Sequence, residues 1–161
     1  MRSESPAAHF AALVALTGCD FSMNLPALGP TKIWAARSKL RDNPLQECVH
    51  IVTALVVVYQ QLLQNKAHHV GPETIRSITD TRGATQVYGL MHASALKSLA
   101  LAPRTKSSLW TAECIRAHAC NVMWTLMYWT ELHAAPDPLS GNFGYVNVKN
   151  HVQYEAECPG V

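Results

Sequence analysis

The chain has 161 residues, of which 48% are hydrophobic and 15% are charged; this composition excludes intrinsic disorder, and the length suits one domain or slightly more. The formal net charge of +2 is uneven, because residues 1–110 hold 11 basic and 6 acidic residues whereas residues 111–161 hold 2 and 5. A polyanionic partner therefore fits the first part of the chain better than the last.

Proline predicts where several helices begin, because its fixed φ and missing N–H suit the first helical turn. The first predicted helix spans 6–17, and Gly18 follows it as a left-handed cap. Further X-Pro pairs predict helices over 30–40 and 44–66, and residues 71–73 predict the start of a short helix. The helix over 44–66 also carries an apolar stripe with helical spacing, made of Cys48, Val52, Leu55, Tyr59 and Leu62.

The second half of the chain predicts two more helices and a hairpin. One helix covers 84–101 and stops at Pro103. The other covers 109–133, and its buried stripe is predicted to contain Ile115, Ala119, Val122, Leu126 and Trp129. The segments 145–148 and 151–154 are predicted to pair as strands across a Lys-Asn turn.

The cysteines and the apolar runs bear on compartment and membranes. Five cysteines are an odd number without a CxxC pair, which predicts reduced thiols in an intracellular protein. The most apolar run, Val49 to Tyr59, is about half the ~20 residues that a transmembrane helix needs. We therefore expect a buried helix there and no membrane partner.

The segment from Leu16 to Ala36 carries the most information about function. Gly29-Pro30 predicts a helix start at which backbone N–H groups and the helix dipole favour an anion. Four cations then follow within ten residues, which favours duplex nucleic acid as a partner: Lys32, Arg37, Lys39 and Arg41. The alternative is an ordinary helix start with a solvated basic face.

The same residues carry a family resemblance. Gly18-Cys19-Asp20-Phe21, followed by Leu25-Pro26-Ala27-Leu28-Gly29-Pro30-Thr31-Lys32, resembles a junction in the flap endonuclease/XPG family of structure-specific 5′ nucleases. In that family a Gly-Cys-Asp-Tyr-like element leads into an Ile-Gly-Ile-Gly-Pro-Lys-like turn of a helix–two-turn–helix element. The resemblance covers about residues 10–40. Ala27 departs from it where a glycine is usual, and Thr31 where a lysine is common.

The resemblance implies the C-terminal part of a PIN-like 5′ nuclease fold, a nuclear protein, and DNA hydrolysis that depends on Mg²⁺ or Mn²⁺. It implies that Asp20 is a metal ligand, and we assign no catalytic residue in this chain. The Gly-rich turn implies duplex DNA binding and a site for a monovalent cation. Gly29, Pro30, Thr31 and Lys32 match that turn, and Arg37 and Lys39 extend its positive charge.

The predicted fold is all-α, with a helix–two-turn–helix segment over 1–42, a helical bundle over 43–135 and an extended tail or small hairpin over 136–161. Two-metal hydrolysis needs several carboxylates, whereas Glu4 is the one acid before Asp20. The sequence therefore reads as a fragment or C-terminal half of such a nuclease. Its expected partners are a separate N-terminal nuclease half and duplex DNA, bound weakly and without sequence preference.

Two rival interpretations remain, a non-catalytic helical DNA-binding module and a helical interaction protein with an incidental Gly-Pro turn. Cys114 and His118 have the i, i+4 spacing that a zinc site can use, with Cys120 close by. Free cysteines in apolar helices are more often buried core residues. A group of aromatic side chains could stack on nucleic-acid bases, but aromatic residues on an amphipathic helix more often belong to the hydrophobic core. The group consists of Trp110, Trp124, Tyr128 and Trp129.

Overall fold

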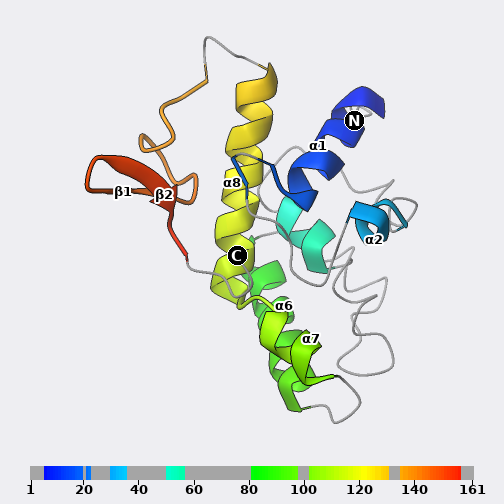
Figure 1. The fold of residues 1–161 in the computed structure, drawn as a ribbon. Helices are drawn as coiled ribbons and strands as arrows, with labels where there is room; N and C mark the ends of the chain where they lie inside the picture. The colour runs from blue at the N-terminus through cyan, green and yellow to red at the C-terminus, as the bar shows by residue number, and fades with distance from the viewer. Residues whose placement is uncertain are drawn as a thin grey trace.

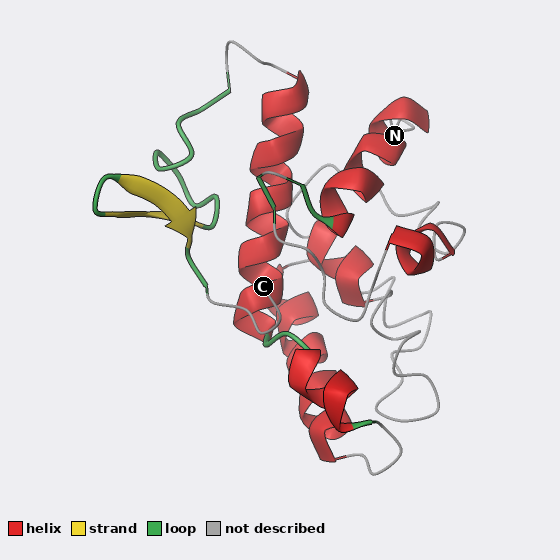
Figure 2. Cartoon of the chain, viewed as in Figure 1, coloured by secondary structure: helices red, strands yellow, loops and turns green. Residues whose placement is uncertain are grey.

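A computed structural model describes the chain over residues 6–19, 21–22, 30–35, 50–56, 81–97, 102–130 and 135–156. These residues form helices and one two-stranded antiparallel sheet (Figures 1 and 2). In chain order the elements are α1 (Pro6–Thr17), α2 (Pro30–Ala35), a helical segment over 50–56, α6 (Thr81–Lys97), α7 (Pro103–Ser108), α8 (Ala112–Thr130), β1 (Tyr145–Val148) and β2 (His151–Tyr154). The predicted mostly helical fold is confirmed.

The first helix begins and ends where the sequence predicts. α1 runs from Pro6 to Thr17, and Gly18 follows with φ 112°, in the left-handed region that glycine adopts without a side-chain clash. The Gly18 N–H donates to the Ala15 carbonyl at 3.3 Å, and the Thr17 hydroxyl donates to the Val14 carbonyl at 2.7 Å. These bonds satisfy carbonyls that the end of a helix leaves without partners.

The helix α8 lies at the centre of the packing, with α1 and α6 against it (Figure 1). Its predicted stripe is confirmed, because three of the five residues are buried in the core and the other two pack against it half-buried. The buried residues are Ile115, Ala119 and Val122, and the half-buried ones are Leu126 and Trp129. The stripe therefore faces the neighbouring helices.

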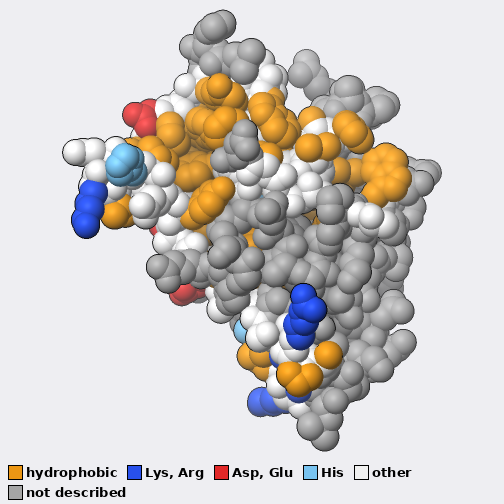
Figure 3. All heavy atoms as spheres, viewed as in Figure 1, with side chains coloured by type: hydrophobic (Ala, Val, Ile, Leu, Met, Phe, Trp, Pro, Cys, Tyr) orange, Lys and Arg blue, Asp and Glu red, His pale blue; other side chains and the backbone are white. Residues whose placement is uncertain are grey.

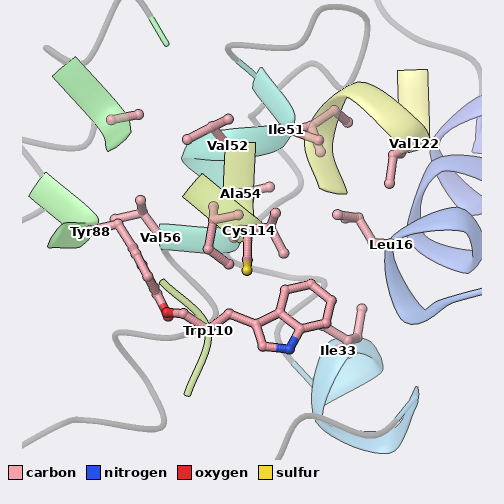
Figure 4. Packing of buried hydrophobic residues seen from close by; sticks show 14 of the residues in the cluster. Leu16, Ile33, Ile51, Val52, Ala54, Val56, Tyr88, Trp110, Cys114 and Val122 are labelled. Atoms are coloured by element: carbon pink, nitrogen blue, oxygen red, sulfur yellow. The ribbon is translucent and has the colours of Figure 1, made fainter. Parts of the chain in front are cut away.

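Trp110 lies just before α8 begins and belongs to the same hydrophobic core. Its side chain is fully buried, and Figure 4 shows its indole near Cys114 and Ile33. The Tyr88 hydroxyl on α6 donates to the Trp110 carbonyl at 2.8 Å. This bond satisfies a buried tyrosine and a buried carbonyl together, which fixes α6 against the start of α8.

The helical segment over 50–56 is buried on every side. The sequence predicts a buried helix over the apolar run from Val49 to Tyr59, and this is confirmed for the described part, because all six residues from Ile51 to Val56 are buried. Val52 and Leu55 belong to the predicted stripe, whereas Cys48, Tyr59 and Leu62 lie outside the described residues. A helix that is apolar all round is expected to be buried, which agrees with the apolar run.

Helix boundaries around Pro103 differ from the prediction. The helix predicted over 84–101 does stop before Pro103, since α6 ends at Lys97 and residues 98–101 lie outside the described residues. Pro103 also begins α7, which the sequence does not predict, and its missing N–H costs nothing there. Leu109 then has extended φ and ψ of −70° and 131°, so α8 begins at Ala112 rather than at residue 109. α6 begins at Thr81, three residues before the predicted start.

The predicted hairpin is confirmed, with β1 and β2 paired from Tyr145–Tyr154 to Val148–His151. The two turn residues, Lys149 and Asn150, have φ of 49° and 67°. Positive φ at both positions is the signature of the type I′ turn, whose twist matches that of the strands in two-residue hairpins. In Figure 1 the hairpin stands beside α8.

Candidate functional site

The helix α2 begins at Pro30, the residue at which the sequence predicts the helix start. Ile33 is buried in the core, whereas Thr31 in the first turn is exposed. The Trp34 ring is 48% exposed and meets the Phe10 ring of α1 edge to face, with centroids 6.0 Å apart. The short helix is therefore held against α1 while part of its first turn stays accessible.

The other predicted site residues are placed only in part. Lys32 belongs to the first turn of α2. The proposed metal ligand Asp20 and four residues of the predicted phosphate site lie outside the described residues: Gly29, Arg37, Lys39 and Arg41. For the predicted phosphate site, the structure therefore shows where the helix begins and which of its residues pack against the core.

The described residues next to Asp20 form a tight turn. Cys19 and Ser22 exchange two backbone hydrogen bonds, of 3.0 and 3.4 Å. The Ser22 hydroxyl donates to the Ala15 carbonyl at 2.8 Å, so the Cys19 thiol is the donor in the 3.3 Å contact between Sγ and the Ser22 Oγ. The Phe21 N–H in turn donates to Sγ at 3.4 Å. The Cys19 thiol therefore contacts both the Ser22 hydroxyl and the Phe21 backbone within the turn.

Two aromatic residues of α8 pack against Phe21 in the same turn. The Phe21 ring lies 5.5 Å from the Trp124 ring and 5.1 Å from the Tyr128 ring, between centroids. Trp124 is buried, and its indole N–H donates to the Pro136 carbonyl at 2.9 Å. The interpretation of these aromatic residues as core is confirmed for Trp110 and Trp124.

Tyr145 of β1 connects the hairpin to the same turn, because its hydroxyl donates to the Phe21 carbonyl. Burial raises the pKa of the Tyr145 hydroxyl; Tyr154 and Cys19 raise it further, and a hydrogen bond with Thr125 acts against them. The hydroxyl therefore stays protonated as a donor. Sequence reasoning missed this role, since no local pattern reports a contact between residues 124 positions apart.

The described residues around the turn do not fit a two-metal site. They offer a thiol, hydroxyls and aromatic rings, whereas Mg²⁺ prefers carboxylate and other oxygen ligands. Within the described ranges, no group of three or more His, Cys, Asp or Glu residues could hold a metal ion. Of the described carboxylates, that of Glu155 is exposed and pairs with Arg116 at 3.7 Å.

His118 is a core residue rather than part of a zinc site with Cys114. Its side chain is fully buried, and the Nε2–H donates to the Leu16 carbonyl at 3.1 Å. Nδ1 has no hydrogen-bond partner among the described residues. Burial lowers the pKa of His118 to about 4, against the opposing effect of the Leu16 bond. The imidazole is therefore neutral and joins α8 to the end of α1.

Comparison with protein-family models, curated proteins and solved structures found no match to this chain. The described helices include none that is both long enough and apolar enough to cross a membrane.

Proposed function

We propose that this chain is a duplex DNA-binding segment related to the flap endonuclease/XPG-like 5′ nucleases, in which the helix start at Gly29–Lys32 binds backbone phosphates. In this proposal the chain forms the C-terminal part of a PIN-like nuclease fold. The observation that carries it is the start of α2 at Pro30, with Thr31 exposed and Ile33 anchored in the core.

The physical argument rests on how a helix start meets an anion. Backbone N–H groups of the first turn point away from the helix and carry partial positive charge. Gly29 has no side chain to keep a phosphate away from them. Lys32 and the three cations up to Arg41 add charge in the same short segment. A site of this size supports affinities of about 10⁻⁴ to 10⁻⁶ M near physiological salt.

We assign DNA binding, rather than cleavage, to this chain by itself. Asp20 supplies one carboxylate, and hydrolysis between two metals needs several. A separate nuclease half would supply the remaining carboxylates, with Mg²⁺ or Mn²⁺ as the metal. Asp20 would then contribute one metal ligand.

A second candidate function is binding to another protein, with the Gly-Pro turn incidental. It is favoured by three exposed apolar side chains on α1 and α2, namely Phe10, Val14 and Trp34. An apolar interface of this kind depends little on salt, whereas phosphate contacts weaken steeply as salt rises. Salt dependence therefore separates the two functions.

The proposed function is tested by comparing two Gly-Pro pairs in one chain. Gly29→Val blocks the close approach of a phosphate to the backbone at the proposed site. The control is Gly71→Val, in the second Gly-Pro pair, which is followed by the acidic residue Glu73. Fluorescence anisotropy with a labelled blunt duplex should show Kd raised about tenfold, or about 1.4 kcal/mol, by Gly29→Val alone. Folding of both variants is checked by circular dichroism. Equal Kd values for the parent and a folded Gly29→Val would overturn the proposal.

A further inference from the structure

A second basic surface lies in the part of the chain that forms α6 and α7. Residues 81–112 contain no aspartate or glutamate, and the acids that flank the stretch are Asp80 and Glu113. The stretch holds four cations, Arg82, Lys97, Arg104 and Lys106. A run of 32 residues with only positive formal charge offers phosphates attraction without local repulsion.

The structure brings three of these cations to one end of a helical pair. The Tyr88 hydroxyl donates to the Trp110 carbonyl at 2.8 Å, and the His92 ring is hydrogen-bonded to the backbone of Leu109. The residues that follow α7 therefore lie beside the middle of α6, so α7 runs back along α6 toward α8.

Helix geometry then places the charges. Lys97 is five residues past His92 on α6, and Arg104 is five residues before Leu109 on the returning segment. On α6 five helical residues span about 7.5 Å, and Arg104 lies in the first turn of α7, away from Leu109. Both cations therefore lie toward the end of the pair at which α6 ends. Lys97 and Arg104 are exposed, and Lys106 is half-buried. Figure 3 shows Lys and Arg atoms at this end of the molecule.

We propose that this end of the α6–α7 pair, the α6–α7 tip formed by Lys97, Arg104 and Lys106, is a second contact surface for the phosphate backbone of duplex DNA. The choice of duplex DNA as the polyanion rests on the proposed function, whereas the surface itself does not involve α2. Three cations at one end of two helices can neutralise backbone phosphates and release their counterions. A chain with two separate phosphate-binding surfaces holds a duplex in one orientation, because phosphate contacts position the nucleic acid.

The test compares the full chain with a tip variant carrying Lys97→Gln, Arg104→Gln and Lys106→Gln. The matched control is Lys149→Gln, which removes an exposed cation from the hairpin turn. Kd for a labelled blunt duplex is measured over a series of salt concentrations. The slope of log K against log salt should become shallower by about 0.9 for each lost contact, or about 2 to 3 in total. Lys149→Gln should leave the slope unchanged.

The possible results separate this inference from the proposed function. A parental slope in the tip variant overturns the inference, and the Gly29→Val result still decides the proposed function. A shallower slope in the tip variant, together with a parental Kd for Gly29→Val, supports the tip and overturns the proposed phosphate site at α2. Exposed Leu96 lies beside Lys97, so binding to vesicles of phosphatidylserine and phosphatidylcholine is measured in parallel. Binding to these vesicles without binding to duplex DNA would overturn the inference.

Discussion

At the scale of single residues, Gly144 sets the strictest requirement that the described structure shows. Its φ is 78°, and a Cβ atom built on it would lie 2.6 Å from the Ala117 carbonyl oxygen and 2.7 Å from the Asn121 Nδ2. That amide donates to the Phe143 and Gly144 carbonyls at 2.8 and 3.1 Å. A side chain at this position would therefore strain the backbone and separate the hairpin from α8.

We expect Gly144→Ala to lower the free energy of unfolding by at least about 2 kcal/mol, from backbone strain and lost hydrogen bonds. The control is Gly89→Ala in α6, where the nearest atom to a new Cβ is the Ala112 Cβ at 3.9 Å. The free energy of unfolding of Gly89→Ala should rise by about 0.5 to 1 kcal/mol, because alanine is a better helix former than glycine. Urea unfolding followed by circular dichroism measures both, and equal stabilities of the two variants would contradict the role of Gly144.

At the scale of elements, the junction of α1 with α8 depends on a neutral histidine. His118 donates one hydrogen bond to Leu16, and its other ring nitrogen is buried without a partner among the described residues. Protonation would place a charge and an unsatisfied N–H in the core, which is costly without a compensating partner. The junction therefore resists acid less well than a purely apolar contact would.

The stability of the fold should fall as the pH drops from about 6.5 toward 4. The pKa of His118 is lowered from 6.5 to about 4 in the folded chain, so the unfolded chain binds the proton first. The full difference, reached below pH 4, is about 3 kcal/mol. His118→Gln keeps a donor for the Leu16 carbonyl but does not titrate. Urea midpoints measured across this range should fall more steeply for the parent than for the variant, and parallel pH profiles would show that His118 does not couple to folding.

At the same scale, local signals account for the elements that the sequence predicts well. Pro6 and Gly18 mark the two ends of α1, and alternating residues around Lys149-Asn150 mark the hairpin. Pro103 is used in the prediction only as a helix end, although a proline both follows a helix end and suits a helix start, so the start of α7 is missed. The burial of the segment 50–56 follows from the apolar run over Val49 to Tyr59, whereas the apolar stripe by itself marks only one face.

At the scale of the whole molecule, contacts between distant segments assemble the region around the predicted site. Tyr145 reaches Phe21 across 124 residues, and His118 reaches Leu16 across 102. Neither contact has a local sequence signature, so the sequence predicts the ends of α1, the start of α2 and the hairpin, but not the contacts between them. The α6–α7 tip could have been anticipated from the acid-free run over 81–112, but its placement at one end depends on the return of α7 along α6.

The central claim is that the first turn of α2 contacts duplex phosphates, and the salt dependence of Lys32→Gln tests it most directly. Binding of a labelled blunt duplex is measured over a salt series for the parent, Lys32→Gln and the control Lys149→Gln. The account predicts that Lys32→Gln makes the slope of log K against log salt shallower by about 0.9, as expected for one lost phosphate contact. It also predicts that Lys149→Gln keeps the parental slope. A parental slope for Lys32→Gln, or a parent that does not bind duplex at low salt, would contradict the account.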